Sequence, residues 1–106
     1  MPQYTYADYK QWKGDSELIE GIPYSMSPSP IGKHQYVVGQ LILKFSVASK
    51  KHNNYYIYSK LDWIISNTTV FRPDIFIFCG ERIDDYLRES PQLIVEVLSP
   101  KTASKD

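Results

Sequence analysis

Two carboxylates interrupt runs of apolar residues that are typical of buried β-strands. Asp74 stands directly before the apolar residues 75–78, and Glu96 lies inside the apolar segment 93–98. An unpaired carboxylate is costly to bury, so a residue of this kind is normally paired, neutralised or bound to a metal ion. If the two strands are neighbours in one sheet, both side chains can ligate a divalent cation such as Mg²⁺, which prefers oxygen ligands. This pattern indicates metal-assisted hydrolysis of a phosphodiester.

Each carboxylate also has a purely structural explanation. Asp74 is alternatively a strand-entry residue whose oxygens face water. Glu96 is alternatively one half of a buried ion pair, with Arg72 or Arg82 as the other half. The explanations make different demands on the fold, because a shared cation needs the two acids side by side, whereas charge pairing does not need them on separate core strands.

The first part of the chain predicts a short helix and a hairpin. Thr5 and Asp8 have the spacing of a capping box at the start of a helix. Two short strands then follow around a turn at Gly21. Pro23 places the second of these strands at an edge, because proline cannot donate a hydrogen bond to a neighbouring strand. This unit, residues 4–26, is expected at the margin of the domain.

A long helix is predicted next, over about residues 31–52, with the Ser-Pro pair at 29–30 as its N-cap and first position. Six apolar side chains recur at helical spacing and make one buried stripe: Val37, Val38, Leu41, Ile42, Phe45 and Ala48. Three or four strands rich in aromatic and β-branched residues follow in residues 55–99. Because residues 75–78 and 93–95 are apolar on both faces, they predict central strands with a covering layer on each side.

Composition places the chain among ordinary folded domains. It has 106 residues, which is enough for one domain, and its 12 Lys and Arg residues balance 12 Asp and Glu residues. No overall basic field attracts nucleic acid, so any such contact must come from a local patch. The lysines of the long helix and the nearby Tyr55, Tyr56 and Tyr58 are a candidate patch, although alternating tyrosines are also typical of a half-buried sheet face.

The chain shows no feature that directs it to a membrane. Its N-terminus lacks the basic and apolar regions of a signal peptide, and no apolar stretch approaches the ~20 residues that span a bilayer. We therefore expect a cytoplasmic protein that does not contact the membrane.

The same residues carry a resemblance to a known family. Pro73-Asp74 at the head of one strand and Glu96 in the next resemble the PD-(D/E)XK nuclease signature. Five blocks along the chain resemble, in order, those of the bacterial Uma-two family: residues 4–9, 17–21, 26–30 with His34-Gln35, 72–75 and 90–100. The resemblance implies an α/β fold with a restriction-endonuclease-like core, in which a mixed central sheet is flanked by helices. It also implies a metal-dependent endonuclease that acts on nucleic acid, with DNA as the expected substrate.

The resemblance also implies a set of site residues. Asp74 and Glu96 become ligands of Mg²⁺ or Mn²⁺, with the main-chain carbonyl of Val97 as a third ligand. Glu17 becomes an accessory acid near the metal, although a solvated carboxylate on an edge strand is the alternative. His34 lies on the apolar stripe of the long helix and points inward, so it is either a core or capping histidine, or a metal ligand or general base.

One position departs from the superfamily pattern. The lysine that follows the second acid by two residues is replaced by Leu98, and only Lys101 and Lys105 remain after it. In the family the replacing lysine lies on a later helix, so the single domain, residues 1–106, is expected to be truncated at its C-terminus. Two alternatives to an active nuclease stay open: an inactive module that binds nucleic acid or protein, and a fragment that forms an oligomer, with a dimer as the expected state.

Overall fold

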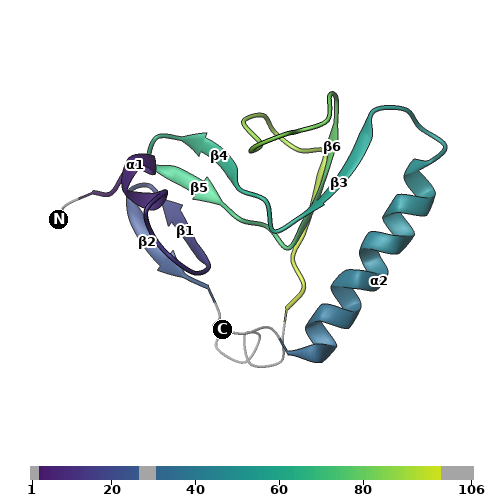
Figure 1. Ribbon diagram of the computed structural model, residues 1–106, viewed down its shortest axis with the longest axis horizontal. Coiled ribbons are helices and arrows are strands. Elements are labelled where there is room, and N and C mark those ends of the chain that lie inside the picture. The colour runs from purple at the N-terminus through teal and green to yellow at the C-terminus, as the bar shows by residue number, and fades with distance from the viewer. Residues whose placement is uncertain (1–2, 27–30, 99–106) are drawn as a thin grey trace.

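The computed structural model describes residues 3–26 and 31–98. Two helices and seven strands follow one another in the order α1 (Tyr6–Tyr9), β1 (Ser16–Ile19), β2 (Ile22–Ser25), α2 (Gly32–Ser49), β3 (Tyr55–Ser59), β4 (Trp63–Ser66), β5 (Thr69–Phe71), β6 (Ile75–Cys79) and β7 (Leu93–Val95), as Figure 1 shows. The predicted α/β class is therefore confirmed.

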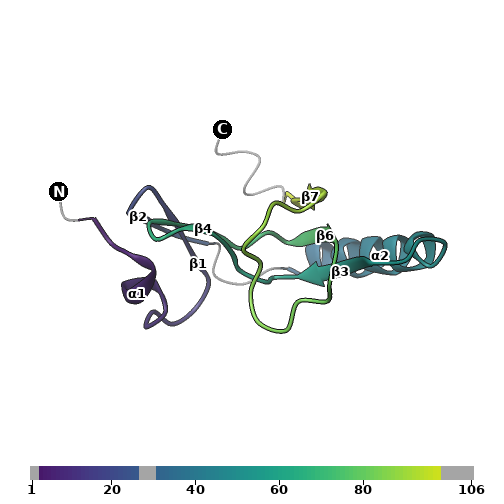
Figure 2. The same ribbon diagram turned by 90° about the horizontal axis from the view of Figure 1, so that it is seen from above.

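The strands are divided between two sheets. The first has the strand order β2-β1-β5-β4 and the second the order β3-β6-β7, and each of the strand pairs in them is antiparallel. Figure 2 shows α1 and the first sheet at one end of the molecule and α2 at the other, with the second sheet between them. The long helix α2 packs along β3.

One long antiparallel ribbon links the two sheets. Ser59 of β3 pairs with Ile75 of β6, and Trp63 of β4 pairs with Phe71 of β5, in the same register. Residues 60–62 therefore lie opposite residues 72–74, where the ribbon passes from one sheet to the other without regular pairing. This junction positions the residues of the candidate site.

Local sequence explains the N-terminal unit. The backbone N–H of Thr5 donates to Oδ2 of Asp8 at 2.9 Å, which confirms the capping box. Glu20 and Gly21 have φ values of 49° and 81°, so both central residues of the hairpin turn are left-handed, as the right-handed twist of the strands requires. Pro23 lies on β2 at the edge of the first sheet, as predicted.

Two apolar clusters form the core, one on each sheet. Tyr9, Leu18 and Val70 form the first cluster, and Phe76, Phe78 and Leu87 form the second. Between them, Arg72 donates from Nε to Oδ1 of Asp62 at 2.7 Å, and the Tyr9 hydroxyl donates to the same oxygen at 3.1 Å. A charged network thus crosses the junction between the sheets.

Some predicted boundaries and burial patterns are wrong. The helix ends at Ser49 rather than near residue 52, and the expected Ser-Pro cap at 29–30 lies outside the described residues. In the apolar stripe Val38 is buried, but Val37 and Ala48 are exposed, because α2 rests on β3 along a narrow contact.

Strand β7 is the larger correction. Leu93 and Ile94 are 44% and 40% exposed, so residues 93–95 do not form a strand covered on both faces. The reason is topological: β7 pairs with β6 alone and forms an edge of the second sheet. The central strand of that sheet is β6, whose burial confirms the prediction for residues 75–78.

Neither helix in the described part of the chain combines the length and the hydropathy needed to cross a membrane.

Candidate active site

Asp74 is buried at the head of β6 and contacts three other groups. It is 5% exposed, which excludes the alternative of a strand-entry residue with solvated oxygens. Its Oδ2 accepts a hydrogen bond of 2.9 Å from the backbone N–H of Val97 and lies 3.4 Å from Nε2 of His34. Its Oδ1 lies 3.4 Å from Nζ of Lys60. Both oxygens therefore face basic or donor groups.

Strand register sets Asp74 in a row with two other charged residues. Ser59 pairs with Ile75 across β3 and β6, and Ile75 pairs with Val95 across β6 and β7. The next position along the same register places Lys60 on one side of Asp74 and Glu96 on the other. Directly opposite residues of antiparallel strands share a face, so the two acids are neighbours, as predicted from their strands.

The ion-pair alternative for Glu96 is not what the structure shows. Arg72 pairs with Asp62 and Asp15, at 2.7 Å and 2.8 Å, and Arg82 pairs with Asp84 at 3.4 Å. The two arginines that were candidate partners are thus engaged elsewhere.

Glu17 reaches the site from the other sheet. It lies on β1, where its Oε2 accepts a hydrogen bond of 2.7 Å from the backbone N–H of Arg72. Because Arg72 is two residues before Asp74, this bond holds the Glu17 carboxylate at the junction. The prediction that Glu17 belongs near the acids is consistent with this placement, while its role stays a prediction.

The surroundings of Glu96 change its acidity. Burial raises the pKa of Glu96 to about 7, and the negative charges of Asp74 and Glu17 act in the same direction, with a backbone hydrogen bond from Asp74 opposing them. Glu96 follows β7 and is exposed, which corrects the expectation that it lies in a buried strand, although protein on one side of its carboxyl group still weakens hydration. Near neutral pH, binding of a proton or a cation therefore stabilises the cluster of acids.

We expect Glu96→Gln to change how stability depends on pH. Because the folded protein binds this proton more tightly than the unfolded chain, the wild-type free energy of unfolding should fall as pH rises from about 4.5 to about 7. A glutamine side chain cannot ionise, so the variant should be more stable above pH 7 by about 1 kcal/mol, after discounting for partial exposure. Urea unfolding in a chelator from pH 4 to 8 measures this.

Glu89→Gln is the matched control, since Glu89 is exposed on the loop after β6. It should leave the pH profile unchanged. A Glu96→Gln profile that runs parallel to the wild type over the whole range would contradict the coupling of the acids.

The donor set suits a hard divalent cation. Among residues 3–26 and 31–98, no three His, Cys, Asp or Glu side chains converge into a ready-made metal site. However, Mg²⁺ commonly uses only one or two carboxylates and keeps several water ligands. Asp74 and Glu96 are the two neighbouring carboxylates that could hold such a cation, and a cation would relieve their mutual repulsion. For Val97, the structure shows its N–H on Asp74, while the predicted role of its carbonyl stays a prediction.

Sequence reasoning missed Lys60. The residue follows β3, and the chain between β3 and β4 contains no motif that marks it. Only the pairing register places it opposite Asp74. His34, by contrast, was found from its place on the apolar stripe, and its side chain is 10% exposed beside Asp74, which confirms that it points inward.

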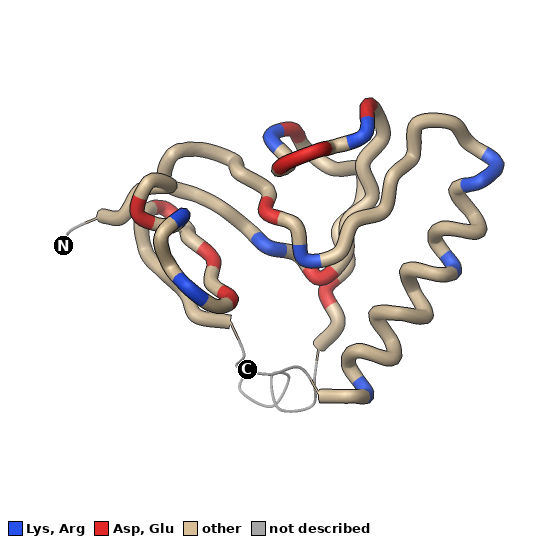
Figure 3. Tube along the Cα trace, viewed as in Figure 1, with Lys and Arg blue, Asp and Glu red and all other residues tan. Residues whose placement is uncertain are grey.

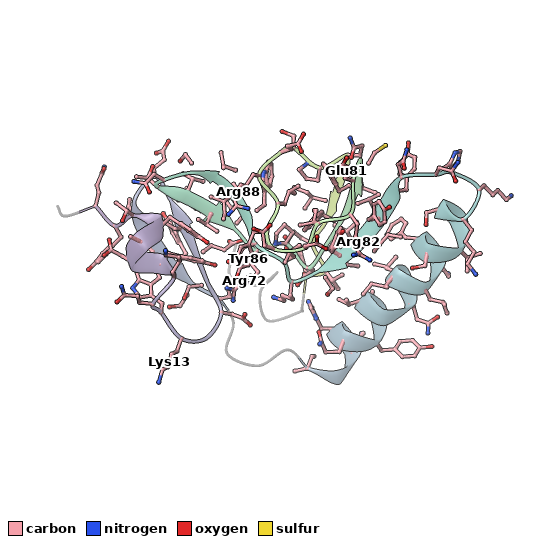
Figure 4. The ribbon with its side chains drawn as sticks, turned by 45° about the horizontal axis from the view of Figure 1, so that its top comes forward. Lys13, Arg72, Glu81, Arg82, Tyr86 and Arg88 are labelled. Atoms are coloured by element: carbon pink, nitrogen blue, oxygen red, sulfur yellow. The ribbon has the colours of Figure 1, made fainter. Side chains whose placement is uncertain are left out.

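A separate cavity is lined by the loop that follows β6. The loop from Gly80 to Glu89, together with Phe78, lines a cleft of about 600 Å³. Arg82 and Glu81 are on this loop, as Figure 4 shows. The loop returns to the junction, where the Leu87 N–H donates to the carbonyl oxygen of Asp62 at 3.0 Å, but none of the three acids lines the cleft.

The fold and the site together define a class of protein. One long helix and antiparallel strands bring acids to the head of a buried strand, an arrangement compatible with a restriction-endonuclease-like core. The model of the family Uma2, described as "Putative restriction endonuclease", matches residues 6–106. The chain therefore belongs to this family, as its motifs predicted. No curated protein matches the chain.

Proposed function

We propose that the protein is an endonuclease that hydrolyses phosphodiester bonds of nucleic acid with Mg²⁺ or Mn²⁺ held by Asp74 and Glu96. The observation that carries the proposal is the buried Asp74 in a row with Glu96, with Glu17 close enough to raise the pKa of Glu96. A cation that binds between these carboxylates would explain why they lie so close together. Membership of the Uma2 family supports the same chemistry.

In this proposal each side chain of the site has its own role in the hydrolysis. A divalent cation, when bound, stabilises negative charge on the phosphoryl oxygens and favours ionisation of a coordinated water. His34 would accept a proton from the attacking water, and Asp74 would stabilise the resulting imidazolium across 3.4 Å. The water oxygen bonds to phosphorus, one ester P–O bond breaks, and the departing oxygen takes a proton from solvent.

A second ring nitrogen keeps His34 oriented. Its Nδ1 lies 2.9 Å from Oε1 of Gln35, the next residue on α2. This contact orients the ring so that Nε2 lies toward Asp74. This arrangement supports the role of general base.

The nucleic acid is expected along α2. Residues 31–60 contain no Asp or Glu but five lysines: Lys33, Lys44, Lys50, Lys51 and Lys60. Figure 3 shows that α2 carries basic charges alone, while acidic residues gather on the other elements. The chain therefore contains a basic segment although its overall charge is balanced. Lysines that neutralise phosphates favour binding of nucleic acid, because counterions are released.

Cleavage assays test the proposal. Single- and double-stranded DNA and a matching RNA are incubated with the protein in Mg²⁺, in Mn²⁺ and in EDTA. We expect cleavage of DNA that requires either ion, and Asp84→Asn should cleave as the wild type does, because Asp84 forms an exposed ion pair away from the acids. Absence of cleavage of all three substrates with both ions would contradict the proposal and favour an inactive binding module.

A further inference from the structure

Lys60 is held in place at the junction by its own backbone. Its φ of 54° is left-handed, an uncommon conformation for a residue with a side chain. Its N–H lies 3.2 Å from the carbonyl oxygen of Pro73 and 3.3 Å from that of Asp74, so both bonds are weak and shared. The Ser59 hydroxyl donates to the Asp74 carbonyl at 3.0 Å as well. These hydrogen bonds to Pro73 and Asp74 therefore position the backbone of Lys60 beside the start of β6.

The Lys60 ammonium lies between the buried acid and solvent. Its Nζ is 3.4 Å from Oδ1 of Asp74, while the lysine side chain is 35% exposed and the aspartate 6%. A substrate that approaches Asp74 from solvent can thus meet the ammonium. His34 contacts the other oxygen of the same carboxylate, so the two basic groups divide the two oxygens between them.

We infer that Lys60 is a catalytic residue of this site, whose ammonium pairs with Asp74 in the free protein and donates to a non-bridging phosphate oxygen when substrate binds. The inference rests on the proposed nuclease function. It assigns a cationic side chain, which Leu98 does not supply, from the segment that follows β3 on the opposite side of Asp74. A donor at that position stabilises the charge that develops on the phosphoryl oxygens as water adds.

The pairing has a second consequence that activity does not report. While the ammonium neutralises Asp74, it competes with a divalent cation for the same carboxylate. Lys60→Gln should therefore bind Mn²⁺ about two- to fivefold more tightly, the range expected for loss of a partly exposed charge pair. The same variant should cleave about 100-fold more slowly, mainly in kcat. Opposite changes in affinity and in rate would not follow from damage to the fold.

The experiment measures Mn²⁺ affinity by calorimetry and kcat and KM by cleavage, for the wild type, Lys60→Gln, Lys60→Arg and Lys13→Gln. Lys60→Arg should recover part of kcat because it keeps a cationic donor. Lys13→Gln should match the wild type, since Lys13 is exposed on the loop before β1 and Figure 4 shows it pointing away from the body of the protein.

Each outcome decides the inference. A wild type that cleaves, with a Lys60→Gln variant whose kcat is unchanged, overturns the role of Lys60 and leaves the nuclease function standing. A wild type that does not cleave overturns both. Weaker Mn²⁺ binding by Lys60→Gln, together with a lower melting temperature, would show that Lys60 is structural and would also overturn the inference.

Discussion

Asp74→Asn is expected to abolish cation-dependent cleavage while the fold persists. Asparagine keeps the shape of the side chain and can still accept the N–H of Val97, so the head of β6 should stay in place. The change removes the charge that His34 and Lys60 both face. A bound cation contributes several kcal/mol to phosphoryl transfer, so its loss should lower cleavage by about 100-fold or more.

A second measurement on the same variant does not depend on activity. Because the Asp74 charge contributes to the raised pKa of Glu96, Asp74→Asn should move that pKa from about 7 toward the ordinary value of a glutamate. Carbon-detected NMR titration of the glutamate carboxyl groups follows this change, and calorimetry follows the loss of Mn²⁺ binding. A variant that still cleaves at the wild-type rate would show that the catalytic centre lies elsewhere.

Arg72→Ala should give the largest loss of stability. Its guanidinium bonds Asp62 at 2.7 Å and Asp15 at 2.8 Å, and the Asp62 side chain is only 9% exposed. Burial acts to lower the pKa of Arg72, but the hydrogen bonds to Asp62 and Asp15 raise it overall. Truncation leaves Asp62 buried without its cationic partner, and breaking such a pair costs about 3 kcal/mol.

The expected change is large enough to measure by two methods. About 3 kcal/mol corresponds to a drop of roughly 10 °C or more in the melting temperature of a domain of this size. Chemical denaturation should show the same change in the free energy of unfolding. Figure 4 shows Arg72 in the middle of the molecule, between the two sheets, so the loss should affect cooperativity of the whole fold.

Arg82→Ala is the matched control for this experiment. Arg82 pairs with Asp84, but the two side chains are 73% and 84% exposed. Surface pairs of this kind contribute about 0–1 kcal/mol, so the variant should unfold close to the wild type. Equal destabilisation by Arg72→Ala and Arg82→Ala would mean that the junction network does not hold the sheets together.

Hydrophobic periodicity and the positions of capping and turn residues in the sequence predicted most of the helices and strands. The capping box at Thr5, the turn at Gly21 and the apolar run of β6 depend on neighbours in the chain, so they could be found without the fold. The burial of β7 could not be predicted in this way, because an apolar segment has the same sequence pattern at the edge of a sheet as at its centre. Whether Leu93 and Ile94 are covered depends on which element lies beside them.

The candidate site divides in the same way. Residue type and local pattern were enough to select Asp74, Glu96 and His34, because carboxylates in apolar segments and an inward histidine can be recognised within single elements. Glu17 was selected only through the resemblance to the Uma-two family. The inclusion of Lys60 needed the register of β3 against β6. The anchoring of Glu17 needed the backbone of Arg72, 55 residues away along the chain.

By itself the sequence determined the class of fold, the family and the acids proposed for the site, because these follow from short-range patterns and from motifs within single segments. Tertiary structure alone decided how the charges are shared. Pairing across the junction places one lysine on Asp74 and commits Arg72 to Asp62 and Asp15 rather than to Glu96. Burial, together with the charge of Asp74, raises the pKa of Glu96. Electrostatic energies depend on distance and burial, and neither is encoded in the spacing of residues along the chain.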